Sequence, residues 1–170
     1  MKRQLIHRIF AWTIDFGIIV LYAILLFTVT SLFFDVRQTD VNPYFGQLVG
    51  FLTLTLPAIT YSCFTEKGNW KATIGKRVFN LIVLTPENKT NNSILIRNLL
   101  KYLPWEIAHT GVHWIIYFES VGRETPIWIW IILIVPQVMV FVYFISIILS
   151  KGQSSVYDRI SGTRLQLRTV

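Results

Sequence analysis

The sequence has one cysteine, few acidic residues and few charged residues in all. Cys63 stands alone, which excludes an intrachain disulfide and a metal cage built from cysteines. Nine acidic residues stand against 16 basic ones, so the formal net charge is +7. Charged residues make up 15% of the chain and hydrophobic residues 53%. This hydrophobic content exceeds that of ordinary soluble domains and predicts an integral membrane protein.

The excess of basic residues does not indicate a nucleic-acid-binding protein. These residues are spread over several loops beside apolar runs, and this distribution favours contact with anionic lipid headgroups. No serine stands in a context suited to a nucleophile with a histidine base. We therefore expect membrane lipids as partners, and we expect no nucleic acid, no cofactor and no enzymatic activity.

Three long apolar runs predict membrane-spanning helices at residues 11–34, 47–64 and 126–149. Each is close to the roughly 20 residues that cross a bilayer. Pro136 is expected to kink the third helix without ending it, because neighbouring helices can satisfy the carbonyl that a proline leaves free. A fourth segment, residues 93–118, is more polar. It either crosses the membrane or lies flat at its surface.

The positions of lysine and arginine favour a crossing at residues 93–118. With four crossings, all basic residues except Arg37 and Arg123 face the cytoplasm, as the positive-inside rule requires. With three crossings, the basic C-terminal tail faces outward. We therefore predict an all-α integral membrane protein, a single domain over residues 1–170, with a four-helix transmembrane bundle in the cell membrane and both termini cytoplasmic. The alternative has three spans and one interfacial helix.

The cytoplasmic loop at residues 65–92 is expected to contain a strand and a turn. Residues 78–84 are rich in β-branched and apolar side chains, and residues 86–89 have the composition of a turn. Lys76 and Arg77 are expected to face lipid phosphates or helix ends. This basic loop supports an alternative function, a non-transporting scaffold that binds lipid headgroups or a partner protein.

Asp15 is the only charged residue of the first apolar run. An ionised carboxylate in hydrocarbon costs at least a few kcal/mol unless it is compensated. Arg8 lies seven residues earlier, close to two helical turns, so both side chains project from one face. Asp158 is expected to lie in a solvated tail. With four crossings, this tail is on the same membrane face as Arg8, so an ion pair between Arg8 and Asp158 is possible. Asp15 then either binds a proton or cation during transport or fixes helix packing.

Glu106, His109 and His113 share one face of the predicted fourth helix, since they are spaced by three and four residues. Carboxylate and imidazole are ligands of first-row metals such as zinc or iron, so a metal site and a membrane-embedded metalloenzyme are one interpretation. A polar stripe with hydrogen-bonded histidines is a second interpretation. A contribution to a proton relay is the third.

Four sequence motifs together resemble the RDD family of small membrane proteins, which is named for one arginine and two aspartates. The motifs are RIFAWTID at residues 8–15, ATIGKR at 72–77, SILIRNL at 93–99 and YDRISGT at 157–163. Two positions depart from the family pattern. Lys71 stands where relatives often have glycine, and Tyr157 stands where histidine is common.

The resemblance implies a transport-linked role with an unknown ligand, and in some relatives an exchange of sodium for protons. Arg8, Asp15 and Asp158 are then the residues linked to the ion, with Asp15 as the titrating site and Asp158 as a lock at the cytoplasmic mouth. Four short helices leave little room for an enclosed pathway. We therefore expect a homo-oligomer, with a homodimer as the natural minimum.

Overall fold

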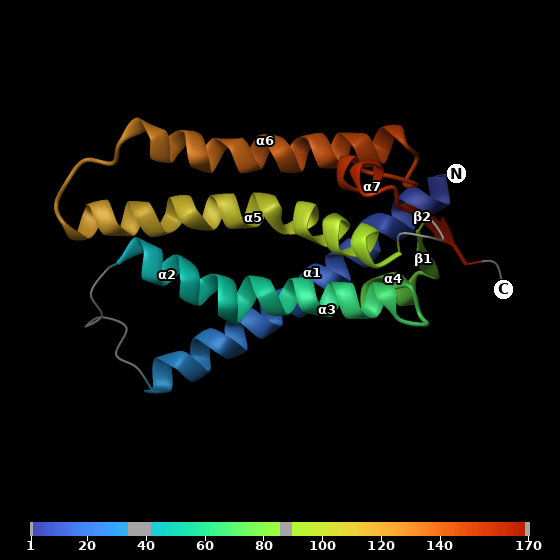
Figure 1. Cartoon of the computed structure of the whole chain (residues 1–170), viewed down its shortest axis with the longest axis horizontal. Helices are drawn as coiled ribbons and strands as arrows, with labels where there is room; N and C mark the ends of the chain where they lie inside the picture. Colours follow the sequence, from blue (N-terminus) through green and yellow to red (C-terminus); the bar gives the residue numbers. More distant parts are fainter. Residues whose placement is uncertain (1, 34–41, 86–89, 169–170) are drawn as a thin grey trace.

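The computed structural model describes residues 2–33, 42–85 and 90–168, and these are mostly helical (Figure 1). The predicted turn at residues 86–89 lies outside them. In chain order the elements are α1 Lys2–Phe33, α2 Pro43–Gly50, the π-helix η2 Phe51–Thr55, α3 Leu56–Lys67, α4 Ile74–Val78, β1 Leu81–Leu84, α5 Thr90–Ser120, α6 Ile127–Leu149, α7 Val156–Ile160 and β2 Arg164–Leu167.

Three stretches of helix are long and apolar enough to cross a membrane: Arg3–Phe33, Pro43–Lys67 and Ile127–Leu149. They correspond to the three predicted spans. The second stretch is one continuous helix, because α2, η2 and α3 follow each other without a break. The more polar α5 has 31 residues, close to the 32 of α1, and lies along α6 (Figure 1).

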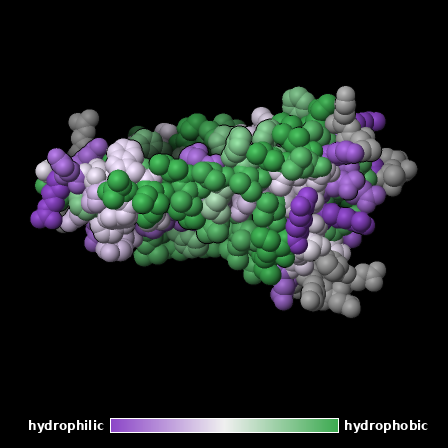
Figure 2. Space-filling model, turned by 90° about the horizontal axis from the view of Figure 1, so that it is seen from above, coloured by the Kyte–Doolittle hydropathy of each residue, from purple (hydrophilic) through white to green (hydrophobic). Residues whose placement is uncertain are grey.

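The long helices alternate in direction. The N-terminus, α4, both strands and α7 gather at one end of the molecule, and α1 leads away from this end (Figure 1). The α2–α3 helix returns to it, α5 leads away again and α6 returns. Figure 2 shows hydrophobic residues over the middle of the molecule, with hydrophilic residues gathered toward both ends. This distribution fits helices that stand across a bilayer.

Two tyrosines supply the hydrogen bonds that two prolines remove from the helices. Pro57 has no N–H to bond the carbonyl of Thr53, and Tyr22 Oη donates to that carbonyl at 2.6 Å instead. Pro104 removes the bond to Leu100, and Tyr143 Oη donates to the Leu100 carbonyl at 3.1 Å. A carbonyl without a partner is costly inside a membrane, so these bonds allow the helices to continue.

Two prolines lie inside long helices and do not end them. The helix α6 runs through Pro136, as predicted, and α5 runs through Pro104. Despite Pro104, α5 is one unbroken element. The π-helix ends two residues before Pro57. At its end, the N–H of Leu56 bonds the carbonyl of Phe51, which is one residue further back than in an α-helix.

A two-stranded antiparallel ladder joins the middle loop to the C-terminal tail. It pairs Leu81 with Leu167 and Leu84 with Arg164. Alternate side chains of β1 point inward, so Leu81 and Val83 are buried, and they form a small core with Leu165 of β2. The strand begins later than predicted because residue 78 still belongs to α4, and its partner strand was not predicted.

We expect Tyr143→Phe to lower the free energy of unfolding by about 1 kcal/mol, because the Leu100 carbonyl loses its donor. In a Pro104→Ala background the new N–H can bond that carbonyl, so the same substitution should cost much less. Thermal unfolding of the four variants in detergent measures this difference. The exposed Tyr44, changed to Phe, is the control and should have no effect. Equal losses in both backgrounds would contradict the assigned role.

Candidate functional site

Six charged side chains are buried together at the end of the molecule that holds both termini. They come from five different helices, and none is more than 6% exposed. We call them the charge network; the bases are Arg8, Lys76 and Arg97, and the acids are Asp15, Glu66 and Asp158. Bases and acids alternate along it and are equal in number, so the network has no net charge.

Arg97 of α5 is the centre of the charge network. Its Nε donates to Asp158 Oδ1 at 2.8 Å, and its Nη1 donates to Glu66 Oε2 at 2.5 Å. Asn98 Nδ2 also donates to Glu66 Oε2, at 3.0 Å. The planar guanidinium thus binds two carboxylates from separate elements, α3 and α7, which a lysine could not do in the same fixed geometry.

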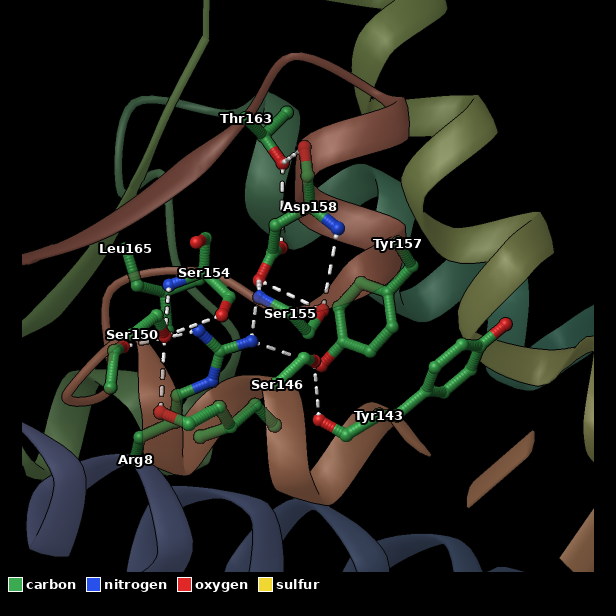
Figure 3. Close-up of polar contacts among 12 residues, drawn as sticks. Arg8, Tyr143, Ser146, Ser150, Ser154, Ser155, Tyr157, Asp158, Thr163 and Leu165 are labelled. Atoms are coloured by element: carbon green, nitrogen blue, oxygen red, sulfur yellow. Dashed lines mark hydrogen bonds and ion pairs between the residues drawn. The ribbon is translucent and has the colours of Figure 1, made fainter. Parts of the chain in front are cut away.

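Asp158 is held by side chains and backbone on all sides (Figure 3). Arg8 Nη2 donates to its Oδ2 at 2.5 Å, so the ion pair that the predicted topology allows is present. Ser155 and Asp158 also form a capping box at the start of α7. Burial raises the pKa of Asp158, but the charges of Arg97 and Arg8 outweigh burial and hold this pKa below its usual range.

The expectation that Asp158 lies in a solvated tail is therefore wrong. Its side chain is fully buried, because α7 folds back against α5 and α6 and β2 pairs with β1. The second guanidinium nitrogen of Arg8, Nη1, donates to the carbonyl of Gly152 at 3.1 Å and so also fixes the turn after α6. The tail is part of the folded domain.

Asp15 receives its hydrogen bonds from the segment around α4. Thr73 Oγ1 donates to Asp15 Oδ2 at 2.5 Å, and the backbone N–H of Gly75 donates to Oδ1 at 2.9 Å. A side chain at position 75 would overlap the carbonyl oxygen of Ala11, so only glycine allows α4 to approach α1 this closely. Asp15 is 5% exposed and is compensated by these donors and by Lys76.

Lys76 does not face the lipid. Its Nζ donates to Glu66 Oε1 at 2.8 Å and to Thr73 Oγ1 at 3.1 Å, and it lies 3.7 Å from Asp15 Oδ2. Burial lowers the pKa of Lys76, and the attraction of Glu66 offsets this only in part. The interpretation of Lys76 as a lipid or partner contact is therefore wrong. Arg77 is half-buried, and its guanidinium stacks on the ring of Trp70.

Glu106, His109 and His113 form a polar cluster with the α2–α3 helix. The Glu106 carboxylate accepts hydrogen bonds from Gln47 Nε2 at 2.9 Å and from Thr55 Oγ1. His109 Nε2 and His113 Nε2 lie 3.1 Å apart and share a hydrogen bond. Glycines 46 and 50 make room for the two rings, because a Cβ at either position would overlap an imidazole.

These three side chains do not converge on one point as metal ligands. Glu106 points to its partners on the neighbouring helix, while the two histidines bond to each other. Within residues 2–33, 42–85 and 90–168, no group of three His, Cys, Asp or Glu side chains could hold a metal ion. The metal-site interpretation of Glu106, His109 and His113 is not supported, and the hydrogen-bonded polar stripe describes the geometry.

Glu66 and Arg97 are the network members that the sequence did not single out. Glu66 lies two residues after the apolar run at 47–64, and Arg97 lies on a helix among isoleucines and leucines. A charged residue in such a position needs a partner, and this signal could have identified both. The partners themselves are far apart in sequence, at separations of 31 and 61 residues.

We expect Glu66→Gln to destabilise the protein by about 3–5 kcal/mol, because it leaves Lys76 and Arg97 buried without a shared counter-charge. Thermal unfolding in a neutral detergent measures the effect. The exposed Glu119, changed to Gln, is the matched control and should unfold like the unchanged protein. A Glu66→Gln protein as stable as this control would contradict the network.

We expect part of the stability to be lost in acid because of Asp158. The pKa of Asp158 is lower in the folded than in the unfolded state, so its carboxylate stabilises the fold above the usual aspartate range. This contribution falls as the pH drops through that range and then through the lower folded value. Midpoints of thermal unfolding between neutral and acid pH should fall more steeply for the unchanged protein than for Asp158→Asn. Equal slopes would contradict the assignment.

The comparison with known proteins identifies one family. The model of the RDD family matches residues 3–162, which is most of the chain. No curated protein and no solved structure matches it. The matched region includes all six members of the charge network, together with the three apolar spans of a multi-pass membrane protein. The chain belongs to the RDD family of membrane proteins.

Proposed function

We propose that the protein exchanges sodium ions for protons across the cell membrane. One observation supports this proposal above the others: the Lys76 ammonium occupies a cage of oxygen atoms. The cage consists of Glu66 Oε1 at 2.8 Å, Thr73 Oγ1 at 3.1 Å and Asp15 Oδ2 at 3.7 Å. Hard cations prefer oxygen ligands of this kind, so the ammonium stands in the position of a bound cation.

Lys76 is the proton carrier in this mechanism. Because burial lowers its pKa, the ammonium releases its proton more readily than a lysine in water. The neutral amine leaves the cage one positive charge short. A sodium ion that enters beside Asp15 and Glu66 restores the balance, and a proton that returns to Lys76 expels the sodium ion. One proton is thus exchanged for one sodium ion. Asp15 serves as a ligand rather than as the proton carrier.

Arg8 and Asp158 close the cytoplasmic side of the site. Their ion pair at 2.5 Å fastens α1 to α7, and Arg97 links this pair to Glu66 of the cage. A rearrangement at Arg97 therefore changes the contacts of the cage and of the closing pair at the same time. Such a linked set of contacts is a means of coupling ion occupancy to the opening of one side.

The proposed topology has four crossings with both termini in the cytoplasm. The alternating directions of the four long helices support it, because α6 begins at the far end and α5 connects that end to the basic one (Figure 1). The most apolar part of α1 is not buried against the rest of the chain. This free surface supports a homodimer as the smallest assembly, in which a second copy covers helices that one copy leaves open.

Exchange can be measured with purified protein in liposomes that contain a pH-sensitive dye. A sodium gradient should drive proton movement. We expect Asp15→Asn and Lys76→Arg to reduce the rate by about tenfold or more, since the first removes a ligand charge and the second substitutes a base that keeps its proton. The exposed Glu124, changed to Gln, is the control and should exchange like the unchanged protein.

Folding of each variant is checked by its elution profile and helical content. Sodium-independent proton movement in the unchanged protein would contradict sodium exchange. Full exchange by a folded Lys76→Arg protein would contradict the role of Lys76 as proton carrier.

The topology is tested with a reporter fused after Val170. Because the tail joins the basic end of the molecule, we expect the reporter to be active only on the cytoplasmic side. A second reporter at residue 123, between α5 and α6, should appear outside. A cytoplasmic signal at residue 123 would support the alternative with an interfacial α5.

A further inference from the structure

A small cavity lies beside the charge network and is surrounded by positive charge. Its volume is about 30 Å³, room for a water molecule or a small part of a ligand. Its wall contains four basic side chains and one acidic side chain. The charged residues that line it are Arg8, Asp15, Lys76, Arg97 and Lys101. Arg8, Lys76 and Arg97 are paired with acids of the charge network, so the positive charge that is left without a partner, and that favours an anion over a second cation, is that of Lys101.

Lys101 adds a positive charge that the charge network does not balance. It lies one helical turn after Arg97 on α5, so both side chains project from the same face. Within the part of the chain that the structure describes, no carboxylate lies within ion-pair distance of Lys101. Its ammonium lies 4.9 Å from the centre of the Tyr102 ring, which compensates the charge only in part.

The nearby acids are already occupied by other bases. Both oxygens of Glu66 accept bonds from the charge network, and so do both oxygens of Asp158. Asp15 is bonded by Thr73 and by the backbone of residue 75. With Lys101 included, four bases face three acids, and one positive charge is in excess. A half-buried cation in this position favours a bound anion as its partner.

The cavity borders the outer surface of α1. Trp12 belongs to its wall and is 57% exposed, while Ala11 and Leu165 provide an apolar part of the wall. Tryptophan is typical of the level of the lipid headgroups. The site therefore combines basic donors, an apolar wall and access from the membrane surface. A phosphate group at that level meets all three features, since its oxygens accept from lysine and arginine.

We propose that this cavity binds an anionic phosphate group, with Lys101 as its counter-charge. The group belongs either to an anionic lipid, whose headgroup lies at this level, or to free phosphate. Bound phosphate joins α1 to α5 beside the charge network and stabilises the closed arrangement of that network. The cavity adjoins the oxygen cage, since Asp15 and Lys76 belong to both, but Lys101 belongs to the cavity alone.

The test uses the full-length protein in a neutral detergent and three soluble probes. Short-chain phosphatidylglycerol and inorganic phosphate are anionic, and short-chain phosphatidylcholine has no net charge. Each is titrated while the midpoint of thermal unfolding is followed. We expect a saturable increase with at least one anionic probe and none with phosphatidylcholine. Lys101→Gln should weaken that response by about tenfold, because a charged hydrogen bond is lost.

The exposed Lys67, changed to Gln, removes the same charge from the same end of the molecule and should bind like the unchanged protein. Lys101→Arg keeps the charge and should retain binding; Lys101→Met replaces Lys101→Gln if the latter does not fold.

A response to phosphatidylglycerol alone assigns the site to lipid, and a response to inorganic phosphate alone assigns it to the free anion. No saturable response to either probe, or an equal response in the folded Lys101→Gln protein, would overturn the proposal.

Discussion

The structure depends on the burial of three acids and three bases in one alternating network. A buried charge without its partner costs several kcal/mol, so each member is acceptable only when its neighbours are in place. The members come from the first helix, the end of the second span, the middle loop, the start of α5 and the C-terminal tail. Folding therefore has to bring five distant segments together before all six charges are compensated. This requirement gives the end of the molecule that holds the charge network one defined arrangement.

The same demand for satisfied polar groups shapes the helices inside the apolar region. Prolines 57 and 104 remove backbone donors, and tyrosines from neighbouring helices replace them. The carboxylate of Glu106 likewise finds its donors on the α2–α3 helix. A few hydrogen bonds thus fix the contacts between helices. Side chains of leucine or isoleucine could not do this alone, because they pack equally well against lipid. This explains how a molecule with so much exposed apolar surface keeps a specific helix arrangement.

The sequence predicted the features that depend on one segment at a time. Length and hydropathy identified the three apolar spans, and the composition of residues 78–84 predicted a strand there, of which residues 81–84 form β1. The predicted topology allowed the ion pair between Arg8 and Asp158, because it placed both residues on the same face of the membrane, and the pair is present. The burial of Asp158 did not follow, since it requires a partner strand and a folded tail that no local pattern indicates.

Arg8, Asp15 and Asp158 are the network members that the sequence identified as candidates for the site, and the other three were not identified. Lys76 stands in a basic loop that resembles a lipid-contacting surface, and only the approach of Glu66 and Thr73 makes it an internal residue. Glu66 and Arg97 stand beside apolar residues, which indicates that each charge needs a partner but does not indicate which residue provides it. Whether such a charge is buried depends on how closely other helices approach it. The pattern of residues along the sequence does not give these distances.

The central claim is that the network acts as one unit through Arg97. The most direct measurement is a double-mutant cycle with Glu66→Gln and Asp158→Asn, two acids that contact Arg97 but not each other. After one substitution Arg97 keeps one carboxylate, and after both it keeps none. The account predicts that the double variant loses at least about 1 kcal/mol more unfolding free energy than the two single losses combined. Additivity within about 0.5 kcal/mol would contradict the account.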